Sequence, residues 1–99
     1  MRFRFEAPIV HWRGPAPFYF AAVPEEIGAE IRQVAKFVSY GWGVIPVTAR
    51  IGEVRFTTSL FPRQGSYLLP LKDAVRNQTG RSEGERVAVE MQLAGEPGA

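Results

Sequence analysis

Two arginines in the middle of the chain are spaced so that they could bind an anion together. The alternating stretches 45–51 (IPVTARI) and 54–61 (VRFTTSLF) flank a Gly-Glu pair, and glycine in the first central position is typical of a two-residue type II′ hairpin turn. In that register Arg50 lies directly opposite Arg55 on one face of the hairpin. Two opposed guanidinium groups predict a site for a phosphate, a carboxylate or a nucleic-acid backbone.

The surroundings of this pair leave a second explanation open. Like charges that face each other on a sheet destabilise it by roughly a few tenths of a kcal/mol unless an anion lies between them. Glu6, Glu53 or Glu90 could neutralise the arginines, or the long side chains could extend into water, because exposed charge pairs contribute little. Ser59 lies further along the same face and adds a hydroxyl donor to the anion site.

Three further side chains are candidates for a ligand site. Lys72 and Arg76 are one helical turn apart in an expected helix over residues 71–78, where the alternative is a solvated helix face. Trp42 lies between two glycines and is either packed in the core or the aromatic wall of a pocket. The predicted ligand-binding set is Arg50, Arg55, Ser59, Lys72, Arg76 and Trp42.

Catalysis and metal binding have little support in the sequence. The chain has no cysteine and one histidine, His11, so a cysteine-based zinc site and a pair of histidine ligands are both excluded. Glu25 and Glu26 are adjacent and fit the first turn of a helix better than a shared acid-base site. We therefore expect no metal and no cofactor, and no nucleophile and base can be named.

One domain is expected to position these side chains. A chain of 99 residues buries only about 60–65% of its unfolded surface and cannot support two cores. Its 45% hydrophobic residues, with seven phenylalanines, are enough for one core. We expect a β-barrel domain over residues 1–94 and a flexible tail over residues 95–99.

Charge and cysteine content suggest a compartment and limit the partners. The absence of cysteine favours the reducing cytoplasm, MRFRFEAP is not typical of a signal peptide, and no stretch is long enough to span a membrane. The net charge is only +2, yet residues 50–81 hold six basic and two acidic side chains. Nucleic acid is therefore a weaker expectation than a small anion.

Hydrophobic periodicity predicts six strands and two helices. Residues 2–7 alternate and the strand is expected to continue towards Trp12, while 18–23 (FYFAAV) is apolar on both faces and is expected to be covered on both sides. A helix is expected to follow Pro24, with one apolar stripe. The remaining predicted elements are the 45–51 and 54–61 hairpin, a short strand at 67–71, the helix over 71–78 and an alternating strand over 87–93.

The same order of elements occurs twice in the chain. A short apolar strand, a helix led by proline, a glycine turn and an alternating strand follow one another both from residue 18 and from residue 66. Two such units could interlock as halves of one barrel, since each is too small to bury its own apolar face. The predicted fold is mainly β with two short helices (α+β), a barrel with an internal pseudo-twofold repeat.

Motifs along the chain resemble two known families. The second unit resembles the swapped-hairpin half of AbrB-type regulators, with matches at Pro70, Val75-Arg76, Gly80, Gly84 and 87–89. The full chain is more similar to the bacterial domain-of-unknown-function family 1905, in the stretches GPAPFYFAAVP, GWGVIPVTARIG, FTTSLFP and YLLPLKDAVR. That resemblance implies a double-split β-barrel capped by helices and no agreed biochemical role.

Three functional hypotheses follow. The first is a non-enzymatic module that binds an anionic small molecule or a protein partner through the face of Arg50, Arg55 and Ser59 and the rim at Trp42. The second is DNA binding by analogy with the AbrB-type half, and the third is a small enzyme with its active site in the barrel mouth. The expected state is a monomer or weak homodimer in the cytoplasm, without a membrane partner.

Overall fold

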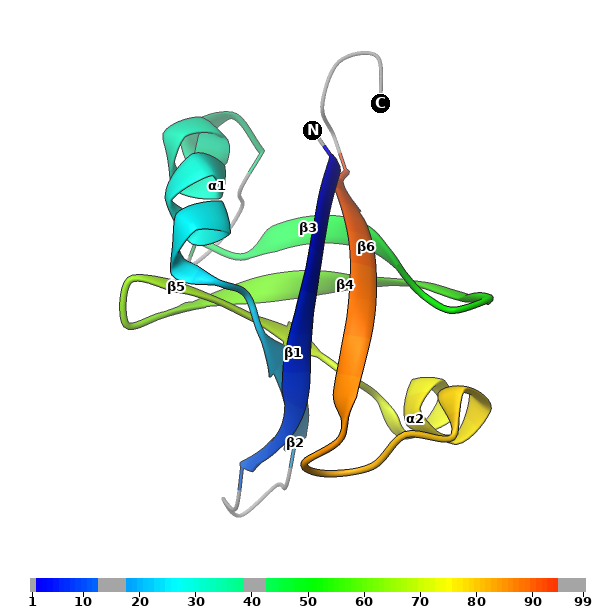
Figure 1. Ribbon diagram of the computed structural model, residues 1–99. Helices are drawn as coiled ribbons and strands as arrows, with labels where there is room; N and C mark the ends of the chain where they lie inside the picture. The colour runs from blue at the N-terminus through cyan, green and yellow to red at the C-terminus, as the bar shows by residue number, and fades with distance from the viewer. Residues whose placement is uncertain (1, 13–17, 39–42, 95–99) are drawn as a thin grey trace.

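The computed structural model describes residues 2–12, 18–38 and 43–94, which form six strands and two helices (Figure 1). The expected flexible tail, 95–99, lies outside the described residues. In chain order the elements are β1 (Arg2–Trp12), β2 (Phe18–Ala22), α1 (Glu25–Val38), β3 (Ile45–Ile51), β4 (Val54–Arg63), β5 (Ser66–Pro70), α2 (Asp73–Thr79) and β6 (Arg86–Leu93).

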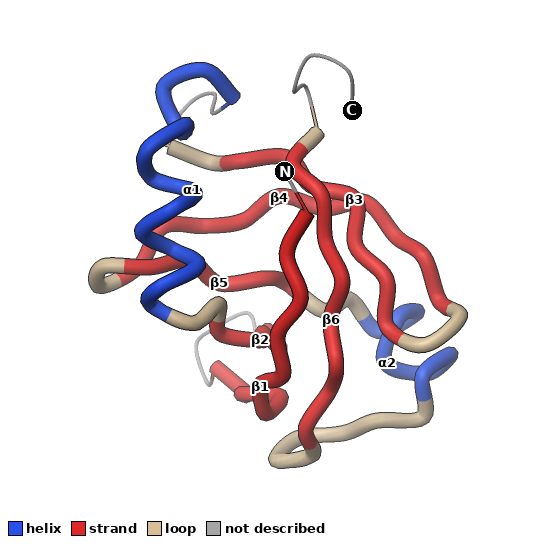
Figure 2. Tube along the Cα trace, turned by 45° about the horizontal axis from the view of Figure 1, so that its top comes forward, coloured by secondary structure: helices blue, strands red, loops and turns tan. Residues whose placement is uncertain are grey.

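The strands close into an antiparallel barrel in the order β1-β2-β5-β4-β3-β6. The two helices lie on opposite sides of this barrel (Figures 1 and 2). The start of β1 and the end of β6 lie side by side at one end, where Arg2 pairs with Gln92 (Figure 1). The predicted fold, a mainly β barrel with two short helices formed by one chain, is confirmed.

An approximate twofold repeat relates β1-β2-α1-β3 to β4-β5-α2-β6. β1 pairs with β2 and β6 just as β4 pairs with β5 and β3. The repeat maps the β2–β5 and β3–β6 pairs each onto itself, and every pair except β1–β2 and β4–β5 joins the two halves. Two backbone hydrogen bonds correspond in the same way: Val23 N–H donates to the Tyr67 carbonyl (3.0 Å), and Leu71 N–H donates to the Tyr19 carbonyl (2.8 Å). Each half thus supplies strands that close the other.

The second helix begins later than the sequence predicted. α2 starts at Asp73, and Lys72 before it has an extended backbone (φ −69°, ψ 160°). In the repeat Lys72 takes the place of Pro24, so Pro70 ends β5 instead of leading the helix. The helix ends where Gly80 adopts a left-handed conformation (φ 69°), which costs glycine little.

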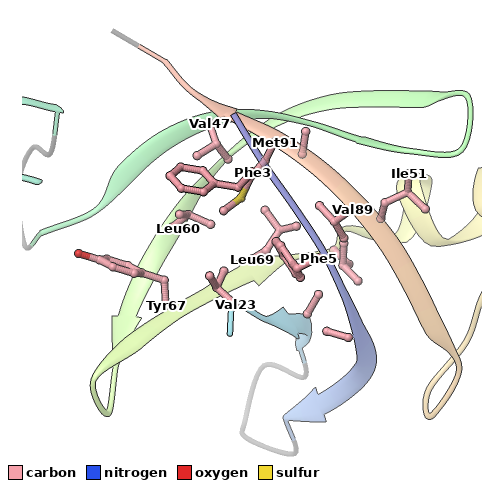
Figure 3. Close-up of a cluster of buried hydrophobic side chains, with 14 of the residues drawn as sticks. Phe3, Phe5, Val23, Val47, Ile51, Leu60, Tyr67, Leu69, Val89 and Met91 are labelled. Atoms are coloured by element: carbon pink, nitrogen blue, oxygen red, sulfur yellow. The ribbon is translucent and has the colours of Figure 1, made fainter. Parts of the chain in front are cut away.

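The barrel interior is filled by alternate residues of every strand. Inward-facing side chains from β1, β3, β4, β5 and β6 point toward one another (Figure 3). Leu60, Leu69 and Leu93 are fully buried, and no charged or polar side chain among the described residues is buried with them. Because period-two alternation sets which side chains face inward, it also sets which face outward.

The prediction that β2 is covered on both sides is wrong. Ala21 is fully buried, but Phe18 on the opposite face is 52% exposed. Runs of apolar residues on both faces usually indicate a strand between two layers. Here the barrel covers the inner face of β2, and neither α1 nor α2 packs over its outer face.

Helix α1 packs closely on β5, which explains its glycine. Ile31 is fully buried, and Ile27 and Val34 pack against the core as the apolar stripe predicted. A Cβ added at Gly28 would lie 2.9 Å from Ser66 Cβ and 3.1 Å from Ser66 Cα, so a side chain there would push the helix away. No helix in the described part of the chain is long and apolar enough to cross a membrane.

Candidate functional site

Four charged side chains form a row across the outside of β1, β6, β3 and β4. The strand register places Arg4 opposite Glu90, Glu90 opposite Arg50, and Arg50 opposite Arg55. All four occupy outward positions because their neighbours along each strand face the core. The predicted hairpin register, with Arg50 facing Arg55, is therefore confirmed.

Glu90 is the carboxylate in this row and is shared by two arginines. One of its oxygens forms an ion pair with Arg4, and the other accepts a hydrogen bond from Arg50. The hydrogen bond from Arg50, followed in size of effect by that from Arg4, lowers the pKa of Glu90 below its usual value. One negative charge is thus divided between two cations, and neither is fully neutralised.

Arg55 lies beside these residues, but the Glu90 ion pairs are made with Arg4 and Arg50. It is exposed and directly opposite Arg50, and among the described residues it has no carboxylate partner. Arg2, one outward position before Arg4, likewise has none within the described residues. The sheet therefore carries uncompensated positive charge on both sides of the Glu90 pairs.

These side chains surround a shallow hollow of about 300 Å³. Its charged lining is made of four arginines and one glutamate: Arg2, Arg4, Arg50, Arg55 and Glu90. Thr48 and Gln92 add neutral polar groups, and both lie in the neighbouring row across the sheet. A cationic surface with a hydroxyl and an amide is suited to binding an oxyanion.

A second hollow, of about 640 Å³, shares part of this lining but has a different charge balance. Arg86 and Glu6 join Arg4, Arg50 and Glu90 there, so three cations face two carboxylates. Arg86 also lies 3.9 Å from Glu6, measured from Nε to Oε1. The smaller hollow beside Arg55 is therefore the stronger candidate for an anion.

A family model for the domain of unknown function DUF1905 matches residues 5–91, nearly the whole chain. The chain belongs to the DUF1905 family. No curated protein matches it. The matched stretch of this DUF1905 domain includes Arg50, Arg55 and Glu90, and it starts just after Arg2 and Arg4.

The other predicted ligand residues of the DUF1905 domain do not join this hollow. Ser59 lies on the same face of β4, opposite Pro46, but it lines neither hollow. Lys72, just before α2, and Arg76, within it, line neither hollow. Trp42 lies outside the described residues.

Arg76 has local partners that account for its position. It forms an ion pair with Asp73, and its Nε donates to the Leu71 carbonyl at 3.4 Å. Its guanidinium carbon lies 3.6 Å from the centre of the Tyr19 ring, which also stacks on His11 at 4.4 Å. These contacts join α2 to the end of the barrel and describe a structural role for Arg76.

His11 offers no metal site in this arrangement. Its Nδ1 lies 3.7 Å from a Glu83 carboxylate oxygen, and its buried Nε2 has no hydrogen-bond partner. Within the described residues no three histidine, cysteine or acidic side chains gather in a way that could hold a metal ion.

Sequence reasoning missed Arg2, Arg4 and Glu90 as members of one site. Their outward direction was visible in the alternation of residues 2–7 and 87–93, and Glu90 was one of three carboxylates considered for neutralising the arginines. The missing information was the pairing of β1 and β3 with β6, which brings together residues far apart in the chain.

Proposed function

We propose that this DUF1905 domain is a non-enzymatic module that binds a small oxyanion, phosphate or carboxylate, in the hollow beside Arg55. The observation that carries the proposal is the excess of four arginines over one glutamate around a single hollow. Guanidinium groups bind oxyanions through two parallel hydrogen bonds, which are stronger than neutral ones.

The arrangement of charges defines how the anion would bind. Arg55 and Arg2 need no rearrangement, since neither has a carboxylate partner among the described residues. Arg50 stands between the anion and Glu90, so the anion and Glu90 compete for it. Glu90 would then lower the affinity for any anion while keeping Arg4 and Arg50 oriented in its absence.

A titration with pyrophosphate, followed by NMR at the backbone amides and arginine Nε–H groups, tests the proposal. We expect the largest shifts at Arg50 and Arg55, and about tenfold weaker binding by Arg55→Gln, the loss expected for one charge-assisted hydrogen bond. Arg81→Gln is the matched control, because it removes the same charge from the turn after α2. Equal weakening by both variants would show a general charge effect and overturn the proposal.

Nucleic acid is the second candidate, because the same arginines could contact backbone phosphates. A duplex bound through several phosphates must lose affinity steeply as salt rises, with a slope of about 0.9 per phosphate contacted. We expect only a shallow slope, since the cationic row spans four strands and holds few uncompensated charges. A steep slope with a DNA duplex, weakened by Arg55→Gln, would favour the AbrB-like hypothesis instead.

A further inference from the structure

The outer surface of the barrel changes character part-way along its two longest strands. β1 pairs with β6 through residues 2–8 and with β2 through residues 9–12. β4 likewise pairs with β3 up to Leu60 and with β5 from Phe61. Outward residues are mostly charged or polar beside β6 and β3, and they become mainly apolar beside β2 and β5.

The second surface, here called the apolar face, extends over four strands. Val10 lies opposite Phe20, which lies opposite Pro70, and Phe61 lies opposite Leu68. Its members are Val10, Trp12, Phe18, Phe20, Ala22, Phe61, Leu68 and Pro70. Of these, Val10, Trp12, Phe18 and Phe61 are each between 46% and 52% exposed.

An apolar outer face of this kind is unusual for a solvent-exposed sheet. A sheet exposed on one side normally alternates apolar inward and polar outward residues, and contiguous exposed apolar surface marks an interaction site. None of the outward positions of β2 and β5 carries a charge. Scattered exposed apolar residues need no explanation, but here they are neighbours in the strand register.

Arg63 adds a cation to this face. The guanidinium carbon of Arg63 is 4.5 Å from the centre of the Trp12 ring, and among the described residues Arg63 has no carboxylate partner. An apolar surface with one unpaired cation is complementary to an apolar surface that carries a carboxylate. A second copy of this chain would present the same cation and is therefore a poorer match.

We infer that the apolar face is a docking surface for an amphipathic helix of another protein, with an acidic residue beside its apolar stripe. A helix laid on the outer face would complete the second layer that an apolar sheet face requires. Single-stranded nucleic acid also stacks on exposed aromatic rings, but it needs a cationic groove along its backbone. The outward positions of β2 and β5 carry no charge, so the observations favour a protein.

Two designed helical peptides test this inference on the whole chain. Both carry a leucine and isoleucine stripe, flanked by glutamates in one peptide and by lysines in its twin. We expect the acidic peptide to shift the NMR signals of Trp12, Phe18 and Phe61, and to bind roughly fivefold tighter than its twin, as one charge pair at an exposed site allows.

Charge reversal at Arg63 distinguishes docking of an acidic helix from non-specific hydrophobic binding. Arg63→Glu should reverse the preference, so that the lysine peptide binds tighter. Phe18→Ser with Phe61→Ser should abolish binding of both peptides while the circular-dichroism spectrum stays unchanged. Arg81→Glu, in the turn after α2, is the matched control and should leave the order of the peptides unchanged.

Other results would overturn the inference. Absence of shifts on this face with either peptide, or equal binding that Arg63→Glu does not alter, would contradict it. Shifts at Trp12 and Phe18 with oligothymidine alone would assign the face to nucleic acid. Self-association in sedimentation that the double serine variant removes would assign it to a second copy.

Discussion

The two outer surfaces of this barrel share an interior and two strands, but they differ in chemistry. On the β6 and β3 side, Arg4, Arg50 and Arg55 surround one carboxylate, Glu90. On the β2 and β5 side, aromatic and aliphatic side chains form the surface, and Arg63 lies over the Trp12 ring. The change occurs where β1 and β4 exchange pairing partners, so topology divides one surface into two.

The two surfaces show how a small barrel can present two kinds of site. Inward residues must be apolar everywhere, because the interior is continuous beneath both surfaces. Outward residues are free of that requirement and can differ from one pair of strands to the next.

The largest effect is expected for the shared interior. Leu60 is fully buried at the residue where β4 leaves β3, so Leu60→Ala removes packing beneath both surfaces. We expect the free energy of unfolding to fall by about 3 kcal/mol, as for other buried leucines. Urea denaturation measures this, with Thr57→Ala on the outer face as the control.

The control variant should change the free energy of unfolding by less than about 0.5 kcal/mol, as usual for an exposed position. Equal losses of unfolding free energy in Leu60→Ala and Thr57→Ala would show that inward and outward residues contribute equally to stability. The comparison between the surfaces would then have no structural basis.

A smaller effect is expected from removing the carboxylate of the charged surface. Glu90→Gln leaves Arg4 and Arg50 without their shared partner and should raise the affinity for pyrophosphate roughly fivefold, the scale of one unit charge at an exposed contact. Calorimetric titration gives the affinity, and Glu83→Gln is the charge-matched control. Lower affinity in Glu90→Gln would mean that Glu90 supports the anion site instead of competing with it.

Acid should act on the same carboxylate. The pKa of Glu90 is lowered in the folded chain, so its ion pairs stabilise the fold above the ordinary value of 4.5 and are lost as the pH falls below it. Protonation frees Arg4 and Arg50, so the affinity for sulfate, which stays charged, should rise below that pH. Titrations at several pH values follow this change.

Glu90→Gln serves as the reference for the acid effect, because it has no carboxylate to protonate at this position. Its sulfate affinity should depend less on pH than that of the wild type. Identical pH profiles for the two proteins would assign the acid effect to other groups, among them Glu85, whose pKa is also lowered by hydrogen bonds from Ser82.

The smallest effect on the fold is expected on the apolar face. Phe18→Ser with Phe61→Ser should change the free energy of unfolding by less than about 1 kcal/mol, because both rings are half exposed. The same variant should bind less of the dye that reports exposed apolar surface. A large loss of stability would mean that these rings hold the barrel together and are not available to a partner.

Much of the fold could be predicted from local pattern. The hairpin register of Arg50 and Arg55 follows from a two-residue turn, and the inward and outward sets follow from alternation. The repeat of elements also predicted that one chain supplies both halves of the barrel. These features depend on residues close together in the sequence.

The candidate site could be predicted only in part, because its other members depend on pairing between distant strands. Arg4 meets Glu90 only through the β1–β6 register, and Lys72, which precedes α2, lines neither hollow. The exposed face of β2 was mistaken for a buried one, since an apolar run looks the same whether a partner or the protein itself covers it.

One NMR experiment on the wild-type chain tests the division of the surface most directly. Pyrophosphate and the acidic peptide are added in turn, and amide and side-chain shifts are mapped along β1 and β4. We expect pyrophosphate to shift the signals of Arg4, Arg50 and Arg55, and the peptide to shift those of Trp12 and Phe61. Pyrophosphate shifts on the apolar face, or none at the arginines, would contradict this expectation.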